Sequence, residues 1–326
     1  MDAVVSGVYG AFYQIIPLEN LKKTNLLKPY LLAKLSGKMR ISKNNKLEAL
    51  VPAIGDRVFY EITDKKNDEI DAHIQSIYER KNVFKRSSHT RVQYLGANID
   101  SIIIILSLDN PPFNEGFLNR ILTEAFLSKI KVLVILNKID LLNQKKSKAD
   151  EYNDIMDSLK YYQKIGYKVF KESLNNQVSP ELSKCLKKGR YLTFGESGVG
   201  KSTFINTFLG EELKSTAEVG FGERGKHTTT NPTLHIYKSN IQIIDVPGIK
   251  EFGLSHRSKY EISQAFIEFQ KYKCQFRDCL HIEEENCGVK AAVKKEKISN
   301  NRYRFYGNII SSLRETYKLR RGNLKK

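Results

Sequence analysis

Short runs in which apolar and polar residues alternate fill the first part of the chain. They lie at 4–16, 30–35, 57–63 and 70–78 and are separated by turn-forming residues. In one of them Val58, Tyr60 and Ile62 alternate with more polar types, which is the period of a strand with one buried face. The pattern predicts a small all-β barrel over residues 1–95.

From about residue 96 the pattern changes to strands and helices in alternation. Predicted strands lie at 101–108, 131–137, 167–171, 189–194, 233–237 and 241–245. Predicted helices lie at 115–128, 148–164, 179–187 and 201–209. This alternation is typical of a mostly parallel sheet with helices on both faces. We therefore expect a central α/β domain over residues 96–257.

The remainder of the chain, residues 258–326, begins with a helical pattern at 260–272. It continues through a cysteine-rich segment into a basic tail that we also expect to be helical. A length of 326 residues suits two or three domains, each with its own core. The sequence thus predicts a multidomain protein whose third domain is mainly helical.

Positive charge changes this picture by suggesting a partner. The chain has 54 Lys and Arg against 36 Asp and Glu, a formal net charge of +18. The residues from Gly288 onward hold more than half of that excess. Such a charge attracts phosphate backbones or anionic lipid surfaces. Of the two, we expect a nucleic acid as the partner.

Membrane insertion and secretion are not expected. The longest apolar runs, at 102–106 and 132–136, are far shorter than the roughly 20 residues that a membrane-spanning helix needs. The N-terminus lacks the basic start of a signal peptide and has the pattern of a strand. We therefore expect a cytoplasmic protein without a membrane partner.

An apolar strand, a glycine-rich loop and a helix follow one another near residue 200, the context of a phosphate-binding loop. The loop and the start of the helix comprise Gly195, Glu196, Ser197, Gly198, Val199, Gly200, Lys201, Ser202 and Thr203. Backbone N–H groups at the glycines can surround the α and β phosphates of a nucleotide. Lys201 can approach the β and γ phosphates, and Ser202 can ligate Mg²⁺. We predict nucleotide binding here, with Lys201 as a catalytic candidate.

A second motif indicates which base is bound. Asn137, Lys138, Ile139 and Asp140 end a predicted strand, so they lie at the carboxyl edge of the sheet, where ligands bind. The Asp140 carboxylate can accept hydrogen bonds from N1–H and the exocyclic amine of guanine, a donor pair that adenine lacks. On its own the tetrapeptide is also a common solvated turn. Together with the phosphate-binding loop it predicts guanine selectivity.

A third motif, Asp245-Val246-Pro247-Gly248, also ends an apolar strand. Its carboxylate can hold a magnesium-bound water, and the Gly248 N–H can meet the γ-phosphate. Between it and the phosphate-binding loop lies the polar stretch 222–230, which is suited to a switch loop that Mg²⁺ and γ-phosphate order. A plain surface loop is the other interpretation of that stretch.

The residue after the third motif departs from many GTPases. A glutamine often orients the attacking water there, whereas this chain has Ile249. An aliphatic side chain cannot orient water, so another group must do so. His227 in the expected switch loop is the polar candidate, although it could equally be a solvated loop histidine. Slow unaided turnover and a macromolecular activator are therefore expected.

The order of these motifs is rotated relative to the familiar one. The guanine motif precedes the phosphate-binding loop, whereas it usually comes last. Such a circular permutation is tolerated when the termini lie close together, because the same sheet forms with a new connection and a new break. The third motif then leads directly into the C-terminal domain. Nucleotide state could therefore be relayed to that domain.

Cysteines gather in the third domain with a histidine. Cys274, Cys279, His281 and Cys287 supply three thiolates and an imidazole, enough to close a tetrahedral zinc site. A site without an open position is structural, and the alternative is a set of ordinary buried cysteines. Cys185 lies apart from them and is expected to be a core residue.

Two other classes of function stay open on these residues. A phosphate-loop ATPase or small-molecule kinase would lack the guanine motif, and competition of ATP against labelled GTP would separate the cases. A zinc-dependent RNA-binding protein could carry the nucleotide site without turnover. In that case a Lys201→Ala variant would hydrolyse GTP no more slowly than the wild type.

Taken together, GESGVGKS, KHTTT, DVPG, the upstream NKID and CQFRDCLHIEEENC resemble the bacterial ribosome small subunit-dependent GTPase A family. The resemblance covers nearly the whole chain. It implies an N-terminal OB-fold barrel that binds RNA, a circularly permuted GTPase domain and a C-terminal zinc domain. It also implies GTP hydrolysis stimulated by the 30S ribosomal subunit, late maturation of that subunit, and contact with 16S rRNA by a monomer.

Residue roles follow from the same resemblance. The phosphate-binding loop and the guanine motif would bind GTP, Ser202 and Thr229 would hold Mg²⁺, the cysteine–histidine set would bind one zinc ion, and His227 matches the family's switch histidine. The chain departs from the family at Glu196, where an uncharged residue is usual. The Ser-Ala element behind the base is represented by Glu172-Ser173-Leu174.

Overall fold

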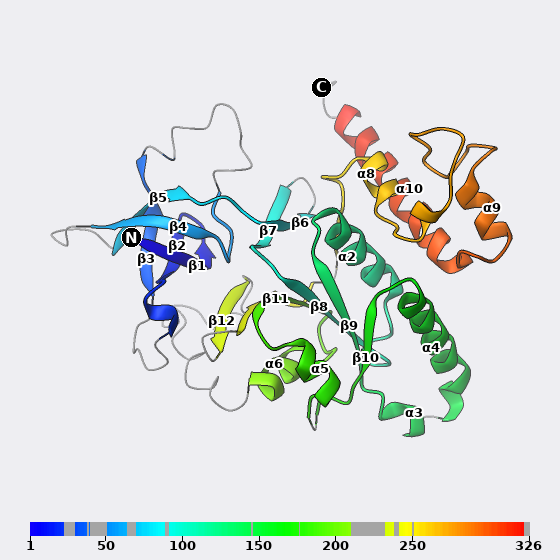
Figure 1. Ribbon diagram of the computed structural model, residues 1–326, viewed down its shortest axis with the longest axis horizontal. Coiled ribbons are helices and arrows are strands. Elements are labelled where there is room, and N and C mark those ends of the chain that lie inside the picture. The colour runs from blue at the N-terminus through cyan, green and yellow to red at the C-terminus, as the bar shows by residue number, and fades with distance from the viewer. Residues whose placement is uncertain are drawn as a thin grey trace.

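The computed structural model contains three parts along the chain (Figure 1). Its described residues are 1–22, 30–37, 39, 51–63, 70–88, 91–144, 146–175, 177–209, 232–237, 241–249 and 251–322. Within these residues no helix is long and apolar enough to cross a membrane.

The N-terminal part is a closed five-stranded barrel, as predicted. Its strands are β1 (Asp2–Tyr9), β2 (Phe12–Pro17), β3 (Leu31–Leu35), β4 (Arg57–Ile62) and β5 (Ala72–Ile77), paired in the order β1-β2-β3-β5-β4, with the 3-10 turn η1 (Asn20–Lys22) after β2. Alternate residues such as Val5, Ile15 and Ile74 are fully buried and fill the barrel. The expected single run at 4–16 is instead a hairpin, because Gly10 adopts a left-handed backbone at its turn.

A separate hairpin follows the barrel, formed by β6 (Val83–Ser88) and β7 (Arg91–Ala97). The sequence pattern did not identify these strands. Few of their side chains are buried, with Phe84, Leu95 and Ala97 the apolar ones. The alternation that marks a half-buried strand is therefore weak in this hairpin.

The central part is a six-stranded sheet in the order β10-β9-β8-β11-β13-β12, parallel except for β12. Its strands are β8 (Ser101–Ser107), β9 (Lys131–Asn137), β10 (Lys168–Lys171), β11 (Gly189–Phe194), β12 (Thr233–Tyr237) and β13 (Ile241–Asp245). Its helices are α2 (Glu115–Leu127), α3 (Leu141–Gln144), α4 (Ala149–Lys164), α5 (Pro180–Cys185) and α6 (Lys201–Leu209), with the turn η3 (Lys146–Lys148) before α4. The predicted mostly parallel sheet is confirmed.

Two layers of helices cover this sheet, and successive residues of β8 show why. Ile102 and Ile104 pack into the core shared with α2 and α4, whereas Ile103 and Ile105 pack into the core shared with α5 and α6. All four isoleucines are fully buried. A strand buried on both faces has the continuous apolar run that marks parallel sheets.

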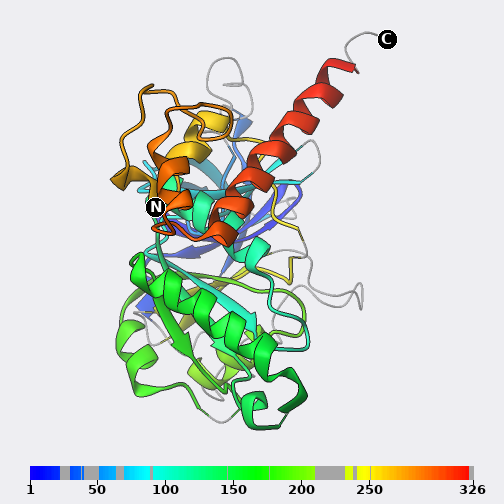
Figure 2. The ribbon, with the colours of Figure 1, turned by 90° about the vertical axis from the view of Figure 1, so that its right-hand side faces the viewer.

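The C-terminal part contains α8 (Lys259–Gln264), the turn η5 (Phe269–Lys271), α9 (Gly288–Lys294) and α10 (Asn300–Gly322). It lies against the outer side of α2, and α10 extends beyond the body of the molecule (Figure 2). The expected helix at 260–272 is wrong in extent, because the chain leaves the helix after Gln264 and turns Glu268 inward. Glu268 then forms an ion pair with Arg302 of α10, with 2.7 Å between Oε1 and Nε, and this contact stabilises the chain in its turned conformation.

Candidate nucleotide site and metal cluster

Three loops meet at the carboxyl edge of the central sheet. Strands β9 and β11 both flank β8, and β13 lies beside β11. The strand ends are in register, since Ser107 pairs with Asn137 and Thr193 pairs with Asp245. The guanine motif, the phosphate-binding loop and the third motif therefore leave the sheet side by side. Their rotated order in sequence does not separate them in space.

A direct contact joins the guanine motif to the phosphate-binding loop. Asn137 Nδ2 donates a hydrogen bond to the Val199 carbonyl at 2.8 Å. Gly200 has a positive φ of 98°, and a Cβ there would lie 2.2 Å from Asn137 Nδ2. Only glycine fits at this position, for both the backbone and the space. Helix α6 begins at Lys201, so its free N–H groups face the same edge.

Lys201 connects the phosphate-binding loop with the third motif. Its Nζ lies 2.8 Å from Asp245 Oδ1 and also donates to the Val246 carbonyl. Asp245 in turn accepts a hydrogen bond from Thr193 at 3.3 Å. A Cβ on Gly248 would lie 3.2 Å from the Ser197 nitrogen, so this loop packs closely against the phosphate-binding loop. Lysine and carboxylate are thus held where phosphates and Mg²⁺ would meet them.

Asp140 is oriented by a neighbour from the next loop. Ser173 Oγ donates to Asp140 Oδ1 at 2.8 Å and accepts from the Asp140 backbone N–H at 3.2 Å. The Leu174 N–H donates to Asn137 Oδ1 at 3.0 Å. The segment Glu172-Ser173-Leu174 therefore supports the guanine motif despite its departure from Ser-Ala. Lys138 has a positive φ of 64° and donates from Nζ to the Asn110 carbonyl.

A further loop of the site escaped the sequence analysis. It links β8 to α2 and lies between the phosphate-binding loop and the guanine motif, because β8 lies between their strands. Asn114 caps α2 through Oδ1 and donates from Nδ2 to Glu196 Oε1 at 3.1 Å. The polar run after a buried strand was the available signal. Glu196 is thereby directed toward the start of α2.

Of the positions expected to act in hydrolysis, the structure describes Ile249 but not the switch loop. Ile249 is 5% exposed and belongs to the core, so it offers no polar group to an attacking water. His227, Thr229 and the rest of the expected switch at 222–230 lie outside the described residues.

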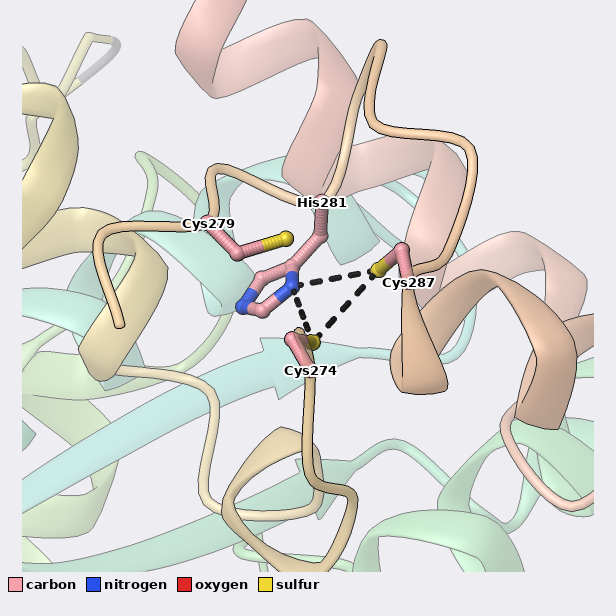
Figure 3. A group of neighbouring side chains, drawn as sticks. All are labelled: Cys274, Cys279, His281 and Cys287. Atoms are coloured by element: carbon pink, nitrogen blue, oxygen red, sulfur yellow. Dashed lines mark hydrogen bonds between the residues drawn. The ribbon is translucent and has the colours of Figure 1, made fainter. Parts of the chain in front are cut away.

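The four predicted metal ligands converge in the C-terminal part (Figure 3). Their ligand atoms all lie within 4.8 Å of one another. Cys274 Sγ is 3.7 Å from Cys287 Sγ, and His281 Nδ1 is 3.4 Å from each of these two sulfurs. A tetrahedral site with zinc–sulfur bonds of about 2.3 Å places its sulfurs about 3.8 Å apart. The residues fit one metal ion of that geometry.

The surroundings of the cluster suit a bound cation. Burial raises the pKa of the Cys279 thiol to about 12 and also raises the pKa of Cys287. Buried thiols of this kind become thiolates when a metal cation compensates the charge. Burial also lowers the pKa of His281, which keeps the imidazole in the neutral form that binds metal. The hydroxyls of Tyr303 and Tyr306 donate to the His281 and Leu280 carbonyls and join the cluster to α10.

Fold and site together define a circularly permuted phosphate-loop GTPase with an N-terminal barrel and a C-terminal cysteine–histidine cluster that could hold one metal ion. The model of the RsgA GTPase family matches residues 77–255. A Flavobacterium johnsoniae protein named small ribosomal subunit biogenesis GTPase RsgA is 35% identical over 292 residues, covering 87% of each chain. Its namesake from Flavobacterium psychrophilum is 32% identical over 98% of this chain and 95% of its own. The chain belongs to the RsgA GTPase family.

Solved structures show the same fold. The crystal structure of YjeQ from Thermotoga maritima superposes with a TM-score of 0.69 at 24% identity and covers 96% of this chain and 98% of its own. The crystal structure of YloQ, described as a circularly permuted GTPase, gives a TM-score of 0.65 at 21% identity over 96% and 95% of the two chains. The predicted architecture is confirmed.

Proposed function

We propose that this GTPase acts in the maturation of the small ribosomal subunit, as the names of its relatives state for them. The observation that supports the nucleotide chemistry most directly is the hydrogen bond from Asn137 to Val199, which joins the guanine motif to the phosphate-binding loop. Only a ligand that reaches from one loop to the other, as GTP does, would use both. The division into residues 1–95, 96–257 and 258–326 is part of this proposal.

GTP would bind along the carboxyl edge of the sheet. Asp140, oriented by Ser173, would read guanine, and the N–H groups of the phosphate-binding loop would hold the phosphates. Lys201 would exchange its contact with Asp245 for phosphate oxygens. Gly248 would approach the γ-phosphate from the third motif. Asn137, Gly195 to Thr203, Asp140 and Asp245 are the residues we assign to this site.

Magnesium would accompany the nucleotide. The Ser202 hydroxyl is an oxygen donor of the kind that Mg²⁺ prefers, with Thr229 as the expected second, and the Asp245 carboxylate would hold a magnesium-bound water. When bound, the ion neutralises negative charge on the β and γ phosphate oxygens. The protein itself positions the phosphates.

Hydrolysis would need a polar group from outside the third motif, because Ile249, which follows that motif, is aliphatic and buried and cannot orient the attacking water. We propose His227 for orienting the attacking water and the 30S subunit for completing the site. Completion by a partner contributes on the order of 10³ to 10⁵ in rate in other GTPases. A His227→Ala variant should keep GTP affinity and lose most of the subunit-stimulated turnover.

The metal at the cysteine cluster would be one structural zinc ion, since Cys274, Cys279, His281 and Cys287 leave no open position. The barrel and the basic C-terminal tail would contact 16S rRNA, with the protein acting as a monomer in the cytoplasm. If the tail makes about six phosphate contacts, affinity should fall about a thousandfold between 50 and 200 mM salt. Binding that is insensitive to salt would contradict this contact.

The decisive experiment measures GTP turnover by the full chain with and without purified 30S subunits. We expect slow turnover alone and strong stimulation by the subunit. Lys201→Ala should abolish both, with Lys188→Ala, an exposed lysine before β11, as the matched control. Equal turnover by the Lys201→Ala variant and the wild type would mean that hydrolysis occurs elsewhere.

Base reading has a test of its own. In Asp140→Asn the carboxylate becomes an amide that can donate to the 2-keto oxygen of xanthine. We expect GTP affinity to fall and xanthosine triphosphate affinity to rise, each by at least about tenfold. Asp157→Asn, an exposed carboxylate on α4, serves as the control. If Asp140→Asn keeps the wild-type preference for GTP, Asp140 does not recognise the guanine base.

A further inference from the structure

Helix α2 carries polar side chains where apolar ones are expected. Asn119, Thr123 and Glu124 are each no more than 1% exposed. A carboxylate is rarely buried so completely unless it is paired and hydrogen-bonded. The burial of the Glu124 carboxylate must therefore be explained by the groups that it binds.

Glu124 holds the chain that follows the third motif. Arg257 donates from Nε to Glu124 Oε2 at 2.8 Å and from Nη2 to Oε1 at 2.7 Å, a bidentate pair. His256 Nε2 lies 3.1 Å from Glu124 Oε2, and its Nδ1 lies 3.0 Å from Ser87 Oγ on β6. Removing the carboxylate would leave a partly buried guanidinium without its bidentate partner.

Residues 251–257, which we call the strap, pack against the body of the molecule. Phe252 and Leu254 are buried in the core on the α2 side of the sheet, and the Phe252 ring lies 6.0 Å from that of Phe194, the residue before the phosphate-binding loop. Gly253 pairs with Ser87 through the backbone. The strap thus runs beside α2 from the nucleotide edge to Glu124.

The strap lies between the nucleotide site and α8 in the sequence. Before it, Gly248 packs on Ser197 of the phosphate-binding loop. At its C-terminal end, Arg257 directly precedes Ser258, which caps α8 with a capping box. If the Arg257 end of the strap is not joined to α2, a displacement of Gly248 is absorbed within the strap. If Glu124 joins that end to α2, the strap and α2 move together, and α2 packs against α8 and α10.

We propose that Glu124 is a positioning residue that joins the Arg257 end of the strap to α2, so that movement of the Asp245–Gly248 loop is transmitted through this pair and α2 to the C-terminal part. This inference rests on the proposed GTP binding. It specifies the ion pair between Glu124 and Arg257, and not chain continuity alone, as the carrier of nucleotide state. Chain continuity is unchanged in a Glu124 variant, so the two carriers can be separated.

The test compares hydrogen exchange of residues 258–313 in the full chain with GDP and with a non-hydrolysable GTP analogue. In the wild type we expect exchange in α8 to differ between the two nucleotides by at least about fivefold. In Glu124→Gln that difference should vanish, while GDP and GTP affinities stay within about threefold. Subunit-stimulated kcat should fall with KM little changed. A residue that only supported the fold would lower both nucleotide affinities together with the kcat.

Glu261→Gln is the matched control. Glu261 also contacts Arg257, at 3.1 Å, but it is half-exposed and belongs to α8 itself. This variant should retain the nucleotide-dependent exchange. If Glu124→Gln does not fold, Arg257→Lys replaces it, because lysine keeps the charge but cannot make two parallel hydrogen bonds. It should weaken the difference at least about threefold.

Three outcomes are decisive. A wild type that binds both nucleotides with identical exchange in α8 overturns the inference and leaves the proposed function intact. A full response in both Glu124→Gln and Arg257→Lys overturns it in the same way. Absence of GTP binding by the wild type, measured separately by fluorescence titration, is instead a failure of the proposed function.

Discussion

The central sheet is joined to its two neighbours by different chemistry. At the barrel junction, Arg190 of β11 donates to the backbone carbonyls of Gly55 and Ala97. At the C-terminal junction, side chains of α2 meet side chains of the third part, through Glu124 with Arg257 and Asn119 with Arg302. One junction uses peptide groups as acceptors, whereas the other uses particular side chains.

This difference suggests different roles for the two junctions. Carbonyl acceptors are present whatever residues occupy the turn, so the hydrogen bonds of Arg190 at this junction do not depend on a charged acceptor. Burial lowers the pKa of Arg190 to about 10, although the nearby carboxylates of Asp100 and Asp56 favour its charged form. The C-terminal junction depends on buried charge pairs and is continuous with the nucleotide edge through the strap. We therefore regard the barrel as passively oriented and the C-terminal part as coupled.

The largest expected effect comes from removing the proposed metal ion, which should break the C-terminal junction and leave the barrel junction intact. Structural zinc supplies about 10 to 16 kcal/mol of apparent folding free energy in small modules. Chelation, or Cys287→Ser, should therefore raise hydrogen exchange throughout the cluster segment and α10, while the amides of Gly55 and Ala97 stay protected. Cys185→Ser, a half-buried cysteine outside the cluster, is the control. Equal loss of protection at both junctions would contradict their independence.

The next effect concerns Arg302, which is 1% exposed and pairs with Glu268. Arg302→Met would leave that carboxylate buried without its cation, at a cost of about 3 to 5 kcal/mol. Denaturant unfolding of the full chain, followed by exchange in α10, measures it. Arg304→Met removes an exposed arginine from the same helix and should have little effect. A similar loss of stability in both variants would show that the charge pair is not responsible.

Arg190→Met tests the barrel junction and should cost less. Its guanidinium also bonds Gln242, so the variant loses donors to several buried acceptors, at about 2 to 3 kcal/mol in total. We expect greater separation of barrel and sheet in small-angle scattering, with GTP affinity unchanged. Arg57→Met breaks an exposed pair with Asp2 and should leave the scattering profile as it is. Loss of nucleotide response in α8 on Arg190→Met would argue against a passive barrel.

Sequence was informative wherever one local rule decides the structure. The apolar strand 131–137 and the motif Asn137 to Asp140 needed only a strand end and a polar loop, and both were predicted. The same holds for β11 with its phosphate-binding loop and for the spacing of the cysteine cluster. Sheet topology then brought these predicted pieces to one edge.

Sequence was uninformative where a tertiary contact overrides a local pattern. Arg302 belongs to a tail whose charge indicates a solvated, RNA-facing surface, yet it is buried against Glu268 and the ring of Phe266. Glu124 has the pattern of an ordinary exposed helix residue until Arg257 is brought to it from a distant part of the chain. The support of Asp140 by Ser173 also needs two loops to meet. Such pairs carry no local signal.

The smallest effect is a dependence on acid that should distinguish the C-terminal junction. Burial alone raises the pKa of Glu124, but hydrogen bonds from Arg257 and His256 outweigh it and hold the pKa below the ordinary value of 4.5. Because the unfolded state binds the proton more readily, this carboxylate stabilises the fold fully above about pH 4.5, and the contribution is lost as pH falls toward the lowered pKa.

The cysteine–histidine cluster also binds protons in acid, so the wild type must be compared with Glu124→Gln, which carries the same cluster. Exchange at the Ser87 amide, which donates to Gly253 of the strap, should rise more steeply with acid in the wild type than in the variant. Identical acid profiles would mean that the charge of Glu124 does not hold the strap, and the contrast between the two junctions would then rest on packing alone.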